Sequence, residues 1–345
     1  MNSSRRLVAW CAFIGAACHT QPAPQAGPAP ARGAPTAVGS TAPAAAPTAA
    51  PATAASTAAP APAPSPQNPS PMLENTRRHE RILQPRRPDD GVNLSIEGIL
   101  PRAIDVFIPQ RALTADSAPL LIHFMGATWL PRHAVATMTR PMIVAATYLG
   151  AGSGVYSRPF AADSALYGRL LDTLKARIAQ VTGAPRITGV YLSGFSAGYG
   201  AIREIVRRPE NISRVDGVLL LDGIHTGYIP DRRPLADSGM IDTTGLSPFS
   251  AFARLAADGK KRFVITHTEI FPGTFASTTE CSDWVLEQLG LKRVPVLEWG
   301  PLGTQMLSHT VKGRFEVLGF AGNTGPDHID QFHGMATFVE RLLAP

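Results

Sequence analysis

From residue 93 onward, short runs of apolar or alternating residues alternate with segments in which apolar residues recur every three or four positions. The short runs predict β-strands, and the longer spacing predicts α-helices. Strands are expected at residues 93–97, 104–108, 119–124, 142–146, 187–192, 218–221, 262–268 and 315–320. Helices are expected at residues 164–180, 197–208, 248–258, 279–289 and 329–342.

Several of these strands are apolar along most of their length, as in PLLIHF at 119–124 and GVLLLD at 217–222, and the later ones alternate with helices. Such strands are typical of a mainly parallel sheet that is covered by helices on both faces. The pattern therefore predicts an α/β fold. In this class, functional groups gather at the carboxyl ends of the strands.

Residues 189–201 read GVYLSGFSAGYGA, and within them GFSAG fits the pattern Gly-x-Ser-x-Gly. A strand precedes this motif and a helix follows it, which is the context of a nucleophile elbow. Gly194 and Gly198 allow a strained turn and close packing of the helix on the strand. The turn would expose the hydroxyl of Ser196 at the edge of the sheet, with the amide of Ala197 facing the same space.

With this motif in its context, the chain resembles the α/β-hydrolase superfamily. The resemblance covers residues 94–343 in the order of the elements, and the elbow is its specific motif. It implies a nucleophile after the fifth strand, an acid after the sixth or seventh, and a histidine after the last. It also implies an acyl-transfer enzyme that needs no cofactor and no metal, and the chain shows neither a phosphate-binding glycine loop nor metal-ligand spacing.

Two histidines follow the last expected strand. His328 lies at the junction between a polar loop and the closing helix, from which an imidazole can reach Ser196. His333 lies five residues later, at an expected helical position. A serine alcohol needs an imidazole to take its proton. We favour His328 as the base and keep His333 as the alternative.

Two carboxylates qualify as the partner of that histidine. Asp222 ends the strand GVLLLD, and Glu269 follows the next strand, FVITHT. We favour Asp222, because it lies directly at a strand end, and keep Glu269 as the alternative. Glu280 is explained by STTE, which reads as a helix capping box. Asp327 is too close to His328 in the chain to orient its ring.

An acyl-transfer site also needs hydrogen-bond donors for the developing oxyanion. The amide of Ala197 is one candidate. The other is expected in the turn after the third strand, LLIHFMGATW, where Gly126 lets the backbone curl back. We assign this donor to Ala127, with Met125 as the alternative. His123 either braces this turn or is a buried strand histidine with local partners.

The first 71 residues differ in composition from the rest of the chain. Residues 1–18 combine Arg5 and Arg6 with a short apolar run and small residues before Cys18, which resembles a bacterial lipoprotein signal with Cys18 lipidated. Residues 19–71 are dominated by Ala, Pro, Thr and Ser and predict an extended, unfolded linker. Residues 72–345 remain as one hydrolase domain. The protein is expected to be exported and lipid-anchored, or periplasmic or secreted if Cys18 is unmodified.

The net charge of +6 is modest and partly N-terminal, and no aromatic-basic motif is present, which argues against nucleic-acid binding. The sequence therefore predicts a serine hydrolase that acts on a small-molecule or lipid ester. A peptidase or amidase of the same fold is one alternative. A non-catalytic, hydrolase-like domain that binds a cell-envelope component is the other.

Overall fold

The computed structural model describes residues 89–183 and 186–344. The expected signal segment (1–18) with Cys18, the expected linker (19–71) and residues 72–88 lie outside the described residues. The elements below therefore all belong to the expected hydrolase domain.

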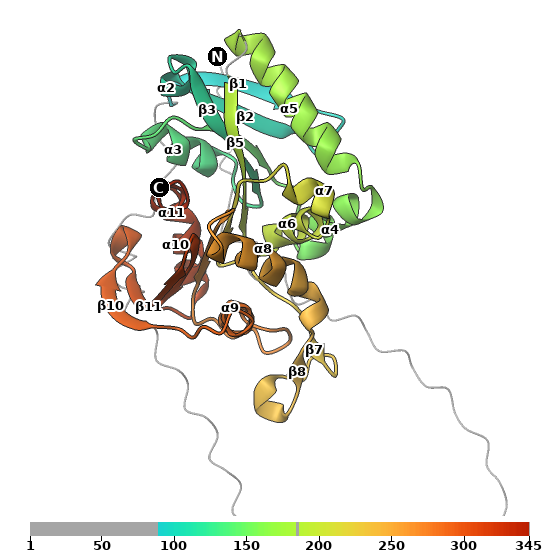
Figure 1. Cartoon of the computed structure of the whole chain (residues 1–345), viewed down its shortest axis with the longest axis vertical. Coiled ribbons are helices and arrows are strands. Elements are labelled where there is room, and N and C mark those ends of the chain that lie inside the picture. The colour runs from blue at the N-terminus through green and yellow to red at the C-terminus, as the bar shows by residue number, and fades with distance from the viewer. Residues whose placement is uncertain (1–88, 184–185, 345) are drawn as a thin grey trace, which may run out of the picture. The chain divides into compact units, whose positions relative to one another are not determined.

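The main sheet has ten strands in the order β1-β2-β4-β3-β5-β6-β9-β12-β11-β10 (Figure 1). Their bounds are β1 (Gly91–Ile96), β2 (Ile104–Pro109), β3 (Ser117–Phe124), β4 (Ile143–Thr147), β5 (Arg186–Phe195), β6 (Gly217–Leu221), β9 (Arg262–His267), β10 (Pro295–Trp299), β11 (Gln305–Lys312) and β12 (Phe315–Phe320). From β4 to β12 the neighbouring strands are parallel, and the pairings at both edges are antiparallel. A separate ribbon pairs β7 (Tyr228–Ile229) with β8 (Met240–Ile241).

Helices connect these strands. They are α2 (Gln110–Leu113), α3 (Trp129–Thr137), α4 (Ser153–Ala162), α5 (Leu166–Thr182), α6 (Tyr199–Val206), α7 (Pro209–Ile212), α8 (Ser247–Ala257), α9 (Thr278–Glu287), α10 (Gly325–His333) and α11 (Met335–Leu342). Short 3-10 turns occur at Ser196–Gly198, Leu235–Asp237, Thr243–Gly245 and Pro301–Gly303. A mostly parallel sheet with this order and these connections is the α/β-hydrolase fold, so the expected fold class is confirmed.

The apolar strands bury both faces of the sheet. In β3, Leu120 and Ile122 belong to one hydrophobic core, whereas Leu121 belongs to the other, because successive side chains of a strand point to opposite faces. The first core also contains residues of α4, α5, α6, α8 and α9, and the second contains residues of α3, α10 and α11. Figure 1 shows α3 and α11 on one side of the sheet and α5, α6 and α8 on the other.

The structure corrects one expectation about the C-terminal part and adds a hairpin that was not expected. The expected helix 329–342 is divided into α10 and α11 at Gly334, where a Cβ atom would lie 2.8 Å from both Pro301 and Phe338. The hairpin β10–β11 was not expected from the sequence. Its edge strand leaves Leu297 and Trp299 exposed, so the strand has no buried face that would give an alternating pattern.

Candidate active site

Ser196 lies at the sharp turn between β5 and α6. Its φ of 48° is in the left-handed region that non-glycine residues rarely adopt, and its side chain is only partly buried. A Cβ atom on Gly194 would lie 2.9 Å from the carbonyl carbon of Gly198. A Cβ atom on Gly198 would lie 2.1 Å from the carbonyl oxygen of Phe124. The two glycines of the motif therefore let the turn pack against itself and against the end of β3.

Replacing Gly198 by alanine is expected to lower the free energy of unfolding by about 1–3 kcal/mol, because the new methyl group meets backbone rather than a movable side chain. Urea denaturation followed by circular dichroism measures the change. The matched control is Gly227→Ala, since a Cβ atom on Gly227 meets nothing within 4 Å. Equal unfolding midpoints for the two variants would contradict the close packing described here.

Asp222 follows β6, the strand next to β5, and it also has a positive φ, of 42°. A Cβ atom on the next residue, Gly223, would lie 2.8 Å from the amide nitrogen of Ser196. The chain after β6 therefore runs directly against the backbone of Ser196. This contact places the Asp222 segment and the elbow at the same edge of the sheet.

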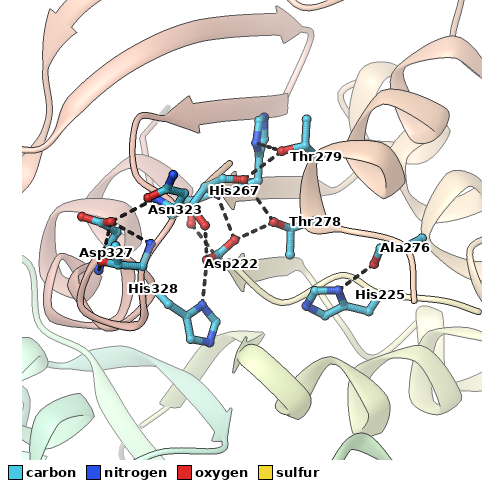
Figure 2. A network of polar contacts seen from close by, with 12 residues as sticks. Asp222, His225, His267, Ala276, Thr278, Thr279, Asn323, Asp327 and His328 are labelled. Carbon is cyan, nitrogen blue, oxygen red and sulfur yellow. Dashed lines mark hydrogen bonds and ion pairs between the residues drawn. The ribbon is translucent and has the colours of Figure 1, made fainter. Parts of the chain in front are cut away.

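The Asp222 carboxylate is fully buried and accepts four hydrogen bonds (Figure 2). Thr268 donates from its amide nitrogen, at 2.9 Å, and from its hydroxyl, at 2.7 Å. Thr278 donates from its hydroxyl at 2.7 Å, and His328 Nδ1 lies 2.7 Å from Oδ2. Burial alone raises the pKa of Asp222, but the hydrogen bonds and the charge of His328, together with the threonine hydroxyls, outweigh it. The pKa lies well below its usual range, and the group is ionised.

His328 is presented by the first turn of α10. Thr324 and Asp327 form a capping box there: the Thr324 amide donates to Asp327 Oδ2 at 2.9 Å, and the Asp327 amide donates to the Thr324 hydroxyl at 3.4 Å. Asp327 is therefore a helix cap, a role that was not predicted from the sequence. The cap fixes where α10 begins and hence where the His328 ring lies.

The His328 ring lies beside the elbow. Its centroid is 4.5 Å from that of Phe195, the residue that precedes Ser196. The side chain of His328 is 24% exposed, so a substrate can reach the ring. Among the described residues no hydrogen bond joins the Ser196 hydroxyl to this ring. Such bonds are often long in enzymes without a bound ligand and tighten in the substrate complex.

The turn after β3 packs against the elbow. Met125 and Gly126 have φ values of 80° and 100°. The amide of Met125 donates to the carbonyl oxygen of Thr147 at 3.1 Å, so it is not available to an oxyanion. This bond argues against the Met125 alternative and leaves Ala127 as the candidate donor from this turn.

His123 braces the same turn from inside the sheet. It is fully buried, its Nε2 donates to the carbonyl oxygen of Met125 at 2.7 Å, and its Nδ1 accepts from the Ser193 hydroxyl at 2.7 Å. Burial lowers the pKa of His123 to about 4, although the bond to Met125 opposes the shift. The ring is therefore neutral at pH 7 and fits the bracing role.

The lowered pKa of His123 predicts a pH-dependent stability. Because an unfolded histidine has a pKa of about 6.5, the contribution of the neutral ring is complete above that pH and is lost as the pH falls toward 4, by up to about 1.4 kcal/mol per pH unit. In His123→Gln, whose amide nitrogen can still donate to Met125, the free energy of unfolding should fall less steeply in this window. Urea denaturation at several pH values measures both slopes, and parallel curves would contradict the assignment.

Four aromatic rings form a continuous stack through the site. His123 stacks on Phe332 with a centroid distance of 5.1 Å, Phe332 stacks on Phe195 at 4.8 Å, and Phe195 contacts His328. Phe332 also fills the space where a Cβ atom of Gly126 would lie, at 2.3 Å. This stack joins the turn after β3 to the elbow and to His328.

The remaining candidates from the sequence lie elsewhere. Glu269 is exposed, and the carboxylate that bonds His328 is that of Asp222. His333 is the last residue of α10. Glu280 forms the expected capping box with Ser277. Cys281 is fully buried, and burial raises the pKa of its thiol, so a reactive thiolate is disfavoured.

Sequence reasoning missed the threonines that hold the Asp222 carboxylate and the ring of Phe332, which stacks on Phe195 and on His123. Thr268 and Thr278 belong to no recognisable motif. Thr268 directly follows β9, and Thr278 is the first residue of α9. Phe332 is four residues after His328, a spacing that places both side chains on one face of a helix. That spacing was the available signal that Phe332 lies near the candidate site.

Other kinds of site find little support in the described part of the chain. No three His, Cys, Asp or Glu side chains among these residues are grouped so as to hold a metal ion. None of the described helices combines the length and hydrophobicity that crossing a bilayer requires. A cavity of about 450 Å³ lies between α9 and the β10–β11 hairpin, away from Ser196, and its lining includes Asp283 and Arg293.

No protein-family model and no curated protein sequence matches the chain. Among solved structures, the S-formylglutathione hydrolase of Agrobacterium tumefaciens is similar at 15% identity and a TM-score of 0.41, covering 76% of this chain and 99% of that one. The enterobactin esterase of Shigella flexneri is similar at 14% identity and 0.45, with 76% and 62% covered. A cold-adapted esterase from an Arctic intertidal metagenomic library is similar at 14% and 0.37, with 74% and 93% covered. Similarity at such low identities and TM-scores does not identify the chemistry of the site.

Proposed function

We propose that the protein is a serine hydrolase that cleaves carboxylic esters, with Ser196 as nucleophile, His328 as general base and Asp222 as the acid that orients it. The main support is the 2.7 Å hydrogen bond between His328 and the buried Asp222 carboxylate, next to a strained serine at a strand-to-helix turn. A buried carboxylate, an imidazole and an accessible alcohol in this order are the requirements for activating a serine.

The proposed first step is a proton transfer coupled to attack. Because the carboxylate of Asp222 only accepts hydrogen bonds, His328 Nδ1 carries the ring proton and Nε2 keeps its lone pair. Nε2 takes the proton of the Ser196 hydroxyl as Oγ bonds to the ester carbonyl carbon. Asp222 remains ionised and stabilises the imidazolium that results.

The carbonyl oxygen becomes an oxyanion in this step, and the proposed donors are the amides of Ala197 and Ala127. Collapse of the tetrahedral intermediate breaks the bond to the alcohol, which leaves with the proton from His328. His328 then deprotonates a water, which attacks the acyl carbon. Collapse of this second intermediate breaks the bond to Ser196 Oγ, which takes the proton back from His328, and the acid leaves. We assign esters rather than amides because an alcohol leaves with less assistance than an amine. No cofactor or metal is required at any step.

A fluorophosphonate probe tests the proposal directly, because it forms a stable bond only with an activated serine. The intact protein should be labelled, and Ser196→Ala should not be. Parallel assays with a 4-nitrophenyl ester and the matching 4-nitroanilide compare the esterase assignment with the peptidase or amidase alternative. Failure of the intact protein to react with the probe or either substrate would favour the non-catalytic binding domain.

A separate proposal concerns export and membrane anchoring, and it rests on the sequence alone. We propose that residues 1–18 direct export and that a lipid on Cys18 anchors the hydrolase domain to a membrane through the linker. Metabolic labelling with an alkyne fatty acid should mark the intact chain and not Cys18→Ala. Equal labelling of both would overturn the proposal.

A further inference from the structure

A second histidine lies at the candidate active site without a role in the proposed triad. His225 is three residues after Asp222, beyond the glycine that packs on the Ser196 backbone. Its ring contacts Tyr199, in the first turn of α6, with a centroid distance of 5.7 Å. In the view of Figure 2 both rings lie below Asp222, that of His328 to its left and that of His225 to its right. His225 therefore lies near the turn that carries Ser196.

The hydrogen bonding of His225 defines what it can offer to a ligand. Its Nδ1 lies 2.9 Å from the carbonyl oxygen of Ala276, which can only accept, so Nδ1 carries the proton. Burial lowers the pKa of His225, with smaller opposing effects from Ala276 and Asp222, and keeps the ring neutral at pH 7. In this tautomer Nε2 is an acceptor, and it has no hydrogen-bond partner within residues 89–183 and 186–344.

An apolar surface adjoins this acceptor. The ring of Phe275 meets that of His225 edge to face, with a centroid distance of 5.1 Å, and Phe275 is still 40% exposed. Phe271, on the same loop between β9 and α9, is 57% exposed. Exposed aromatic side chains beside a single oriented polar atom are typical of ligand-binding surfaces.

We propose that His225 binds substrate: its Nε2 accepts a hydrogen bond from a hydroxyl or N–H group of the ester, while Phe275 contacts the apolar body that carries this group. This inference rests on the proposed esterase function and names its preferred substrates. They are esters in which an apolar or aromatic group bears a hydrogen-bond donor. An unpaired, partly buried acceptor makes the enzyme discriminate against analogues that lack the donor.

The test uses pairs of 4-nitrophenyl esters that differ by one hydroxyl group, such as 3-phenylpropanoate against 3-(4-hydroxyphenyl)propanoate and butanoate against 3-hydroxybutanoate. A matching set of acetate esters, again in pairs with and without one hydroxyl group, places that hydroxyl on the alcohol portion of the ester. In at least one pair the intact enzyme should show a kcat/KM about 10- to 100-fold higher for the hydroxylated ester. Absence of any preference across all pairs would overturn the inference.

Two substitutions separate substrate binding from a structural role. His225→Asn retains a donor for the Ala276 carbonyl but removes the acceptor at the position of Nε2, whereas His225→Gln retains an acceptor there and removes the bond to Ala276. Substrate binding predicts that Asn abolishes the preference for the hydroxylated ester and that Gln keeps part of it. The reverse order would show a structural role and overturn the inference.

Two controls complete the design. Glu269→Gln, at an exposed position, should keep the full preference. Ser196→Ala should remove hydrolysis of both members of each pair. If Ser196→Ala remains active, the proposed function fails. If it is inactive but the preference survives in His225→Asn, only the role of His225 fails.

Discussion

Replacing Ser196 or His328 by alanine is expected to lower kcat for a 4-nitrophenyl ester by about a million-fold, and replacing both should lower it no further. The reason is that the alcohol and the imidazole act as one unit: neither a free serine nor a lone histidine carries out the attack. Steady-state kinetics on the two single variants and the double variant measure this. Circular dichroism confirms that each variant is folded.

A loss in the double variant equal to the product of the single losses would show two independent contributions and contradict the proposed unit. His333→Ala is the matched control for His328→Ala, because both histidines belong to α10 and only His328 bonds Asp222. It should retain activity within a few-fold of the intact protein.

Replacing Asp222 by asparagine is expected to lower kcat by about 10,000-fold. The asparagine amide presents one oxygen in place of two, and its nitrogen donates where His328 Nδ1 also donates. The ring is then driven to the opposite tautomer, in which Nε2 carries the proton and cannot act as a base. The kinetics of Asp222→Asn against those of Glu269→Gln measure the effect, and the latter should be near the intact enzyme.

The same substitution should also destabilise the fold. Because Asp222 accepts bonds from Thr268 and Thr278 in a fully buried position, at least one donor loses its partner, at about 1–3 kcal/mol. Urea denaturation measures this loss separately from the kinetics. If Asp222→Asn keeps full activity, or if Glu269→Gln loses as much, the assignment of the acid is wrong.

Much of the fold could be predicted from the sequence because its strands are buried on both faces. The run GVLLL is apolar throughout because both faces of its strand are covered, and the structure contains every strand that the sequence predicted. Strand β10 was missed because it lies at the edge of the sheet, where its exposed side chains give no pattern. The break between α10 and α11 falls at Gly334, which packs closely against Pro301, whereas the expected helix continued through this glycine.

In the candidate site, too, the residues with a local sequence pattern could be predicted, and those that depend on distant contacts could not. Ser196, Asp222 and His328 could be proposed from the sequence because the first two follow strands and His328 lies in the first turn of a helix. The choice between Asp222 and Glu269 could not be settled from spacing, because it depends on which carboxylate faces His328 across the sheet edge. The threonines that hold Asp222 come from a loop and a helix start after β9, and only the folded chain brings them to β6.

Helix α10 carries both His328 and Phe332, one turn apart. His328 would supply the base, and Phe332 packs against the backbone turn at Gly126, which the candidate donor Ala127 directly follows. A rigid tilt or slide of this helix would displace the two together. Proton transfer and charge stabilisation would then improve or deteriorate in concert, so that variation in the loops leading into α10 would tune the rate of catalysis as a whole.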